Sequence, residues 1–168
     1  TDASKVVVAG TGPAGLIAAL AIARQGTAVT LVGPASPPVD RRTTALMTPS
    51  LDLLERLGLL DTIAAGAAEL RVMRIVDATR RLVRAPTVTF NAGEIDEARF
   101  GLNIPNAHML QVLGDAVAAE PLILRRDALL SGLVAEQDRV VVTLDDGSEV
   151  PAALVIAAEG RNSRARAA

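Results

Sequence analysis

The first part of the chain alternates between apolar runs and a glycine-rich turn. Residues 5–9 (KVVVA) and 28–32 (AVTLV) are short and almost wholly apolar, which is typical of strands buried on both faces of a parallel sheet. Between them, residues 13–25 are rich in Ala and Leu and are followed by Gly26, which predicts a helix that ends at a glycine. Strand, helix and strand together have the length of a parallel βαβ unit, about thirty residues.

The middle of the chain changes to shorter and more polar segments. A loop over 33–44 leads to a predicted helix that begins near Pro49 and ends at Leu57, and Asp61 is expected to cap a second short helix through Ala68. Short β-like runs then predict antiparallel strands within residues 70–78, 81–85 and 87–91, followed by a polar connection over 93–101.

The last third returns to regular patterns. Residues 106–119 have a helical period with Met109 and Leu113 on the apolar face. Two strand-like stretches follow at 122–137 and 139–150, with a hairpin turn at Asp146–Gly147, and residues 153–160 predict a final buried parallel strand that ends in a glycine turn.

These elements predict an α/β fold. Residues 1–68 and 101–168 are expected to form a Rossmann-like nucleotide-binding domain, because they contain the βαβ unit and the later parallel strand. Residues 69–100 are expected to be an antiparallel β insertion, the start of a second domain that this chain does not complete.

Composition and charge exclude several classes of function. The net charge is −2 and the only aromatic residues are Phe90 and Phe100, so neither a basic footprint nor stacking platforms for nucleic acid are present. The chain has no cysteine and a single histidine, His108, so we expect no disulfide and no metal site. No apolar run has the length of a membrane span, which favours a cytoplasmic protein.

The glycine-rich turn is the strongest chemical signal. Gly10, Gly12 and Gly15 have G-x-G-x-x-G spacing directly after the first strand and at the start of the first helix. In such a site the first glycine allows a tight turn, the second lets the backbone approach a pyrophosphate, and the third lets the helix pack against the strand. The helix N-terminus then favours the negative charge of the phosphates.

One expected residue is missing from this site. The second strand of such a unit usually ends in an acidic residue that binds the ribose hydroxyls, but here it ends in Gly33. Either a nearby arginine binds a ribose 2′-phosphate, or the nucleotide is FAD, which is held over a longer length. We expect Gly33→Glu to be tolerated or to tighten binding, because it would supply the ribose acceptor.

Three further stretches bear on this choice: residues 40–60 (DRRTTALMTPSLDLLERLGLL), 101–113 (GLNIPNAHMLQVL) and 153–166 (ALVIAAEGRNSRAR). In this order after GTGPAG, the chain resembles the FAD-dependent aromatic hydroxylases, the group of p-hydroxybenzoate hydroxylase, and within it the ubiquinone-biosynthesis branch. The resemblance covers the whole chain, yet members are about twice as long. It therefore implies the N-terminal part of such an enzyme, without the C-terminal half and its second flavin-binding motif.

The resemblance also implies which residues contact the FAD. The pyrophosphate would lie against Gly10, Gly12, Pro13, Ala14 and Gly15. Arg42 would reach the flavin nucleotide, Arg41 would assist at the ribose, and Asn106 would face the cofactor. Glu159 and Gly160 match the family's Asp-Gly pair, which lies near the pyrophosphate and helps accommodate NAD(P)H, although Glu159 is one methylene longer than the aspartate.

The implied reaction is hydroxylation of an aromatic, polyprenyl phenol-type substrate with NAD(P)H and O₂, and no residue of this chain is assigned as catalytic. Two alternatives stay open, an FAD-dependent reductase or dehydrogenase and a non-catalytic dinucleotide-binding fragment, and the 168 residues alone are expected to be inactive. The branch also implies peripheral membrane association or a complex with other quinone-biosynthesis enzymes.

Overall fold

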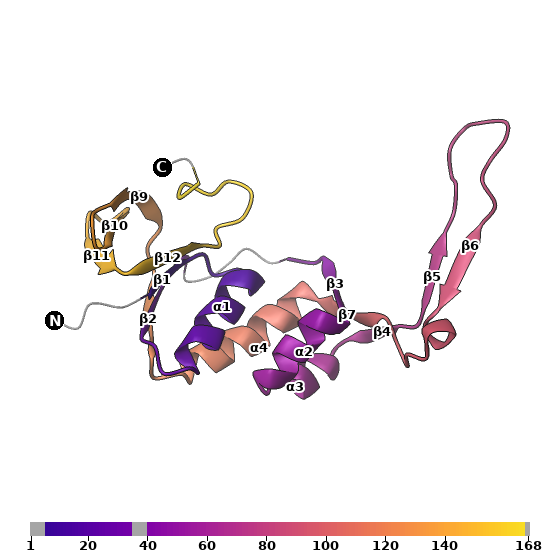
Figure 1. Ribbon diagram of the computed structural model, residues 1–168, viewed down its shortest axis with the longest axis horizontal. Coiled ribbons are helices and arrows are strands. Elements are labelled where there is room, and N and C mark those ends of the chain that lie inside the picture. The colour runs from indigo at the N-terminus through magenta and orange to yellow at the C-terminus, as the bar shows by residue number, and fades with distance from the viewer. Residues whose placement is uncertain (1–5, 35–39, 167–168) are drawn as a thin grey trace. The chain divides into compact units, whose positions relative to one another are not determined.

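The computed structural model describes residues 6–34 and 40–166 (Figure 1). The chain forms two compact units. The parallel-sheet unit combines the residues up to Asp40 with those from Met109 onward, and the inserted unit comprises Arg41–His108. The predicted division, with residues 1–68 and 101–168 in a nucleotide-binding domain and residues 69–100 as the start of a substrate domain, stays a prediction. Lys5 and residues 35–39 of the predicted loop lie outside the described residues.

A four-stranded parallel sheet forms the centre of the parallel-sheet unit. Its strand order is β12-β1-β2-β8, and every neighbouring pair is parallel. The helix α1 joins β1 to β2, which confirms the predicted βαβ unit. The bounds of these elements are β1 Val6–Ala9, α1 Pro13–Ala23, β2 Val29–Val32, β8 Ile123–Arg126 and β12 Leu154–Ala157.

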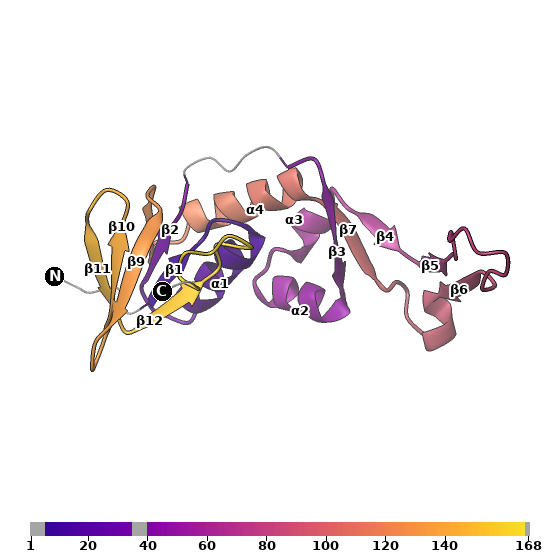
Figure 2. The ribbon, with the colours of Figure 1, turned by 90° about the horizontal axis from the view of Figure 1, so that it is seen from above.

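Both faces of β1 and β2 are covered, which explains their wholly apolar sequences. Successive side chains of a strand point to opposite faces. Val7, Ala9 and Val32 pack in one cluster with the antiparallel sheet β9–β11. On the other side of the parallel sheet lies α1, whose Leu16 and Leu20 are buried (Figure 2).

The antiparallel sheet has the order β11-β10-β9. The strands β10 and β11 form the predicted hairpin, and Gly147 adopts a positive φ of 81° in its turn. Leu130, Val142 and Leu144 are its main contributions to the shared core. The bounds of its strands are β9 Leu130–Ala135, β10 Val140–Leu144 and β11 Glu149–Ala152.

The helix α4 (Asn106–Ala118) agrees with the helical period of the sequence. Met109, Leu113 and Val117, which are spaced by four residues, are all buried. Within residues 6–34 and 40–166, no helix combines the length and the apolar composition that crossing a bilayer requires.

The inserted unit has its own sheet of order β3-β7-β4, in which β7 pairs with both neighbours in antiparallel fashion. Leu54 and Ile63 from two short helices are buried, as are Leu102 and Ile104 of β7. A separate hairpin pairs β5 with β6. The bounds are β3 Thr43–Met47, α2 Thr48–Arg56, α3 Leu60–Ala64, β4 Ala68–Leu70, β5 Val72–Ile75, β6 Val88–Asn91, the 3₁₀ helix η1 Ala92–Ile95 and β7 Gly101–Pro105.

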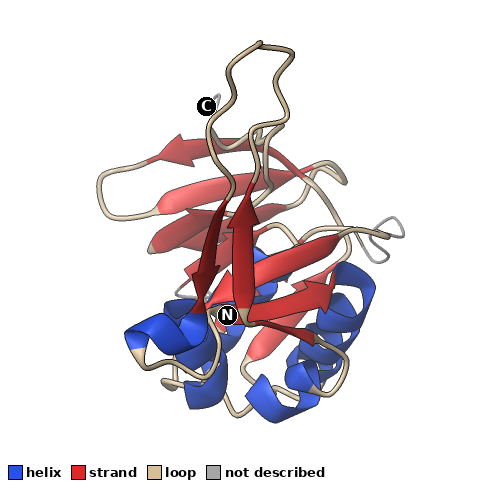
Figure 3. Cartoon of the chain, turned by 90° about the vertical axis from the view of Figure 1, so that its right-hand side faces the viewer, coloured by secondary structure: helices blue, strands red, loops and turns tan. Residues whose placement is uncertain are grey.

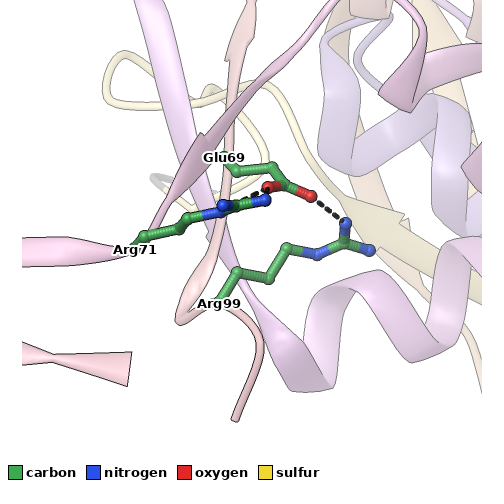
Figure 4. Close-up of polar contacts among 3 residues, drawn as sticks. All are labelled: Glu69, Arg71 and Arg99. Carbon is green, nitrogen blue, oxygen red and sulfur yellow. Dashed lines mark hydrogen bonds and ion pairs between the residues drawn. The ribbon is translucent and has the colours of Figure 1, made fainter. Parts of the chain in front are cut away.

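A carboxylate clamp holds the two ends of this hairpin segment. Glu69 of β4 accepts hydrogen bonds from Arg99 (Nη1 to Oε1, 2.9 Å) and from Arg71 (Nε to Oε2, 2.7 Å), as Figure 4 shows. The hydrogen bonds from Arg99 and then Arg71 lower the pKa of Glu69 below its ordinary value. Arg71 precedes β5 and Arg99 precedes β7. Their shared contact with Glu69 therefore holds together the two ends of the segment 72–98, which contains the hairpin (Figure 3).

The structure corrects several details of the sequence-based assignment. The strands β3 and β7 were not predicted, because TTALM lies in a polar context and GLNIP contains Gly and Pro. The predicted strand over 81–85 is an irregular loop. Asp61 lies inside the first turn of α3 and does not cap it. The strand β12 pairs with β1 as predicted, but as an edge strand it is only partly buried.

Two glycines in helices should respond oppositely to alanine. A Cβ at Gly15 would lie 1.9 Å from the carbonyl oxygen of Gly10, whereas a Cβ at Gly114 of α4 would meet nothing within 4 Å beyond its own helix. We expect Gly15→Ala to lower the free energy of unfolding by about 3 kcal/mol or more, because backbone atoms must move apart. Gly114→Ala should raise it by about 0.5–1 kcal/mol, because alanine favours the helix. Urea unfolding followed by circular dichroism measures both, and equal effects would contradict the close packing of α1 on β1.

Candidate cofactor-binding site

The turn from β1 into α1 is built from backbone in very close contact. Gly10 has a φ of +119°, and its N–H donates to the carbonyl of Val32 (2.7 Å). A Cβ at Gly10 would lie 2.2 Å from the carbonyl oxygen of Ala158, which follows β12. Gly15 is equally crowded, as described above. Glycine is therefore required at both positions, for the turn and for the packing of α1 against β1.

Gly12 is different, because the space beside it is open. A Cβ at Gly12 would meet no atom within 4 Å. Gly12 is also the N-cap residue of α1, Pro13 follows at the first helical position, and none of the described side chains caps this helix end. The backbone N–H groups of the first turn thus have no acceptor within the helix and form the positive end of its dipole. A pyrophosphate could satisfy these donors without meeting a side chain at position 12.

A pocket of about 530 Å³ opens at this turn. Its size lies within the range of about 300–1,000 Å³ that is usual for small-molecule and cofactor sites. The carboxyl ends of β1, β2 and β12 meet here, which is the edge of a parallel sheet where nucleotides bind. Its described lining residues are Ala9, Gly10, Thr11, Gly12, Pro13, Ala14, Val32, Gly33, Pro34, Leu129, Leu130, Ala158, Glu159, Gly160, Asn162 and Arg164.

The loop after β12 brings both charges of the pocket. Among the described lining residues, Arg164 is the only cation and Glu159 the only anion. Glu159 Oε2 accepts hydrogen bonds from Ser163 Oγ (2.8 Å) and from the N–H of Ala165 (3.0 Å). The carboxylate of Glu159 thus stabilises its own loop, and these hydrogen bonds partly compensate its charge. Arg164 can therefore attract an anion that binds in the pocket.

The structure brings together six of the ten residues that the resemblance implies. Gly10, Gly12, Pro13 and Ala14 line the pocket with Glu159 and Gly160, and Gly15 lies directly beneath it against Gly10. The other three belong to the inserted unit.

In the inserted unit, Arg41 and Arg42 are exposed and Asn106 is buried. The N–H of Asn106 donates to the carbonyl of Arg42 (2.9 Å), and Thr44 Oγ1 donates to Asn106 Oδ1 (2.6 Å). These bonds join the start of α4 to the segment that enters β3. The roles of Arg41, Arg42 and Asn106 toward a cofactor stay predictions.

Gly33 has a structural role that the sequence did not reveal. It is buried, and a Cβ there would lie 2.6 Å from Thr11 Cγ2 and 3.0 Å from the backbone nitrogen of Thr11. Thr11 is itself buried and donates from Oγ1 to the carbonyl of Pro34 (3.3 Å). The expectation that a glutamate is tolerated at position 33 is therefore wrong: the close approach of the glycine-rich turn to the end of β2 requires a residue without a side chain.

Sequence reasoning did not name ten of the sixteen described lining residues as contacts, among them two leucines and an arginine. Leu129 and Leu130 form an apolar wall where β8 leads into β9, and Thr11, Asn162 and Arg164 add polar side chains. Arg164 belongs to an arginine cluster that the sequence shows, but nothing in the spacing separates it from its neighbours Arg161 and Arg166. The leucines reach the pocket only through the parallel pairing of β2 with β8.

Comparison with known proteins agrees with this geometry. The chain belongs to the FAD binding domain family, whose pattern matches residues 3–168. It is 31% identical over 175 residues to the 3-demethoxyubiquinol 3-hydroxylase of Escherichia coli (strain K12), covering 97% of this chain and 43% of that protein. It is 27% identical over 168 residues to the ubiquinone hydroxylase UbiL of Rhodospirillum rubrum, covering 96% of this chain and 38% of that protein.

Solved structures share the fold. The p-nitrophenol 4-monooxygenase PnpA from Pseudomonas putida DLL-E4 superposes with a TM-score of 0.77 at 23% identity, over 96% of this chain and 42% of that chain. The flavin-dependent monooxygenase PieE, solved in complex with FAD and substrate, gives a TM-score of 0.77 at 22% identity, over 96% of this chain and 31% of that chain. The chain thus spans about two fifths of the length of the curated relatives it matches.

The fold, the glycine-rich pocket and the family together define an FAD-binding domain. The predicted resemblance to the FAD-dependent hydroxylases and to their ubiquinone branch is confirmed.

We expect Gly12→Val to abolish FAD binding while the fold is retained. The valine side chain would fill the space beside the helix N-terminus without meeting protein atoms at its Cβ, so it would exclude the phosphates and little else. Quenching of flavin fluorescence on titration with the protein measures the affinity. Gly132→Val in β9 is the matched control, because a Cβ there also meets nothing within 4 Å and lies outside the pocket. Wild-type affinity in the Gly12 variant would contradict this placement of the pyrophosphate.

Gly33→Glu should weaken FAD binding by about tenfold or more. The new side chain would crowd Thr11 and displace the glycine-rich turn, and such overpacking costs roughly 1–3 kcal/mol. The same titration tests it. Adding Thr11→Ala removes the two side-chain atoms that a new Cβ would meet and should restore part of the affinity. A Gly33→Glu protein that binds FAD as tightly as the wild type would show that the turn adapts and that the close approach is not required.

Proposed function

We propose that this chain is the FAD-binding part of an aromatic monooxygenase that hydroxylates a prenylated phenol with NAD(P)H and O₂. The observation that carries the proposal is the pocket of bare backbone at the N-terminus of α1, in a chain that belongs to the FAD binding domain family. The nature of the substrate is supported by the relatives, which are named as hydroxylases of ubiquinone or its precursor.

The residues of the pocket fit the diphosphate part of FAD. The N–H groups of the first turn of α1 would bind the diphosphate, and the open space at Gly12 would admit it. Arg164 would add positive charge at the rim. Leu129 and Leu130 would contact apolar parts of the nucleotide and exclude water from that side.

The remaining predicted contacts belong to the same proposal. Arg42 and Arg41 would bind the flavin nucleotide, Asn106 would face the cofactor, and Glu159 with Gly160 would accommodate NAD(P)H. Because Glu159 is engaged by Ser163 and Ala165, its contribution to NAD(P)H binding would be to hold the loop and not to bind the dinucleotide directly.

Bound FAD supplies the redox chemistry, taking electrons from NAD(P)H and activating O₂. In the overall reaction, an aromatic C–H becomes C–OH, NAD(P)H is oxidised to NAD(P)⁺ with uptake of one proton, and the second oxygen atom leaves as water. The part of this chain in that reaction is to bind and orient the cofactor and to keep water from the diphosphate. Peripheral membrane association and complexes with other quinone-biosynthesis enzymes stay predictions at this point.

The reaction is tested with the protein purified from the cells that make it, so that any further segments are present. The FAD-loaded protein is given NADH or NADPH, a short-chain 2-prenylphenol and ¹⁸O₂. We expect the phenol to stimulate oxidation of one of the reduced nicotinamides and mass spectrometry to find one ¹⁸O in the hydroxylated phenol, whereas the 168 residues alone should bind FAD without turnover.

Gly12→Val is the negative control, because it should lose FAD and activity together. Oxidation of the nicotinamide without ¹⁸O in the phenol would contradict hydroxylation and support a flavin reductase. If neither the protein purified from its cells nor the 168-residue chain binds FAD, the whole proposal is contradicted.

A further inference from the structure

The end of β2 has no acidic side chain and has no room for one. A Cβ at Gly33 would lie 2.6 Å from Thr11 Cγ2 and 2.9 Å from Thr11 Oγ1. The side chain of Thr11 therefore fills the place where an acidic side chain at position 33 would begin. Among the described lining residues, the only anion is Glu159, which lies on the loop after β12. The side of the pocket at β2 is thus formed by uncharged residues.

A guanidinium lies at the end of β2 instead. Arg125 of β8 donates from Nη2 to the carbonyl of Pro34 (2.8 Å), and Thr11 Oγ1 donates to the same carbonyl (3.3 Å). Both Pro34 and Thr11 line the cofactor pocket. A positive charge therefore lies one hydrogen bond away from the wall of the pocket, close to the position at which an acidic ribose ligand usually stands.

The pairing of β8 with β2 determines which arginine reaches this place. Arg125 pairs with Leu31, and Arg126 pairs with Val32. Val32 packs against the antiparallel sheet, so Arg126 belongs to that face of the parallel sheet. Because successive side chains of a strand point to opposite faces, Arg125 belongs to the face that α1 covers.

Two carboxylates lie near Arg125 on this face. Asp127 Oδ1 accepts a hydrogen bond from Arg125 Nε (2.9 Å), and Asp127 is exposed, so solvent screens part of its charge. Asp115 of α4 lines a cavity of about 190 Å³ together with Arg125 and Thr11. Since Thr11 lines both this cavity and the cofactor pocket, the two spaces adjoin there. Neither carboxylate belongs to the lining of the cofactor pocket, whereas an acidic residue at the end of β2 would.

The sign of the charge at this place decides which adenosine the pocket accepts. A carboxylate at the end of β2 accepts hydrogen bonds from the ribose hydroxyls and repels a 2′-phosphate, whereas an arginine nearby accommodates the phosphate. A phosphate monoester carries about two negative charges at neutral pH, and its oxygens are strong acceptors for a guanidinium.

We propose that Arg125 makes the ribose end of the cofactor pocket receptive to a 2′-phosphate. A 2′-phosphorylated adenine nucleotide, such as NADP(H), then competes with FAD for this pocket. The inference rests on the proposed function in one respect, because it requires that the adenosine of FAD lies at the end of β2. It adds a second class of ligand for the same pocket, one that an acidic ribose ligand would exclude.

Displacement of FAD tests the proposal. The protein is purified from the cells that make it, freed of FAD and reloaded, and the recovery of flavin fluorescence is followed as a competitor is added. The two competitors are ADP and 2′-phosphoadenosine 5′-diphosphate, which differ only in the 2′-phosphate. We expect the 2′-phosphorylated competitor to have an affinity at least about threefold higher than that of ADP.

The ratio of the two affinities separates a contact with the 2′-phosphate from a general loss of structure, which would weaken both competitors alike. Arg125→Gln should lower this ratio by about fivefold or more, and Arg125→Lys should restore part of it, because the charge is kept. Arg126→Gln is the matched control. The hydrogen bonds from Ser148, and more weakly the charge of Arg126, lower the pKa of Asp146 in the β10–β11 turn, so Arg126 lies toward that turn. The control should leave the ratio unchanged.

A variant with an acidic ribose ligand provides the converse test. Thr11→Ala combined with Gly33→Glu removes the side-chain atoms that crowd position 33 and adds a carboxylate there. This double variant should prefer ADP to its 2′-phosphorylated form by about tenfold, because like charges repel.

Three results would overturn the proposal while leaving FAD binding intact. They are a wild-type preference for ADP, failure of both competitors to displace FAD, and an equal ratio in Arg125→Gln and the wild type. Loss of the ratio in Arg126→Gln as well as in Arg125→Gln would show a general charge effect and would also contradict a contact with Arg125. If the wild type does not bind FAD at all, the proposed function itself fails, and this inference fails with it.

Discussion

The close contact of helix α1 with strand β1 is the constraint on which the candidate site depends. A hydrogen atom at Gly15 is all that fits against the carbonyl of Gly10, and Gly10 itself leaves β1 with a positive φ against the backbone of Ala158. This contact places the N-terminus of α1 at the edge of the parallel sheet. The open space at Gly12 then lies between donor N–H groups and solvent, where a diphosphate can be bound by backbone alone.

The rest of the parallel-sheet unit supports that contact. The cluster of Val7, Ala9 and Val32 with the antiparallel sheet covers one face of the parallel sheet, and α1 covers the other. The edge strand β12 brings the loop with Glu159 and Arg164 to the pocket. The packing at Gly33 is equally close, because the end of β2 lies so near Thr11 that a side chain is excluded. Packing thus explains why this strand ends in a glycine.

The sequence predicted the parts that follow from local pattern. The βαβ unit, the helix α4 and the last hairpin have strongly periodic sequences, and glycines mark the turns of the βαβ unit and of the hairpin. All three are present in the structure. The strands β3 and β7 were missed because their pairing, not their own composition, makes them strands: Gly101 is required where β7 passes Met47, and Pro105 lies at the end of a strand. The pocket residues Leu129 and Leu130 were missed for the same reason, since only the pairing of β8 with β2 brings them to the nucleotide edge.

The account depends most on where the diphosphate binds, and a crystal structure of this chain with FAD measures this directly. The account predicts that the pyrophosphate oxygens lie within hydrogen-bond distance, about 2.7–3.2 Å, of the backbone nitrogens of the first turn of α1, beside Gly12. A structure in which FAD is bound elsewhere, or in which side chains fill the space at Gly12, would contradict it.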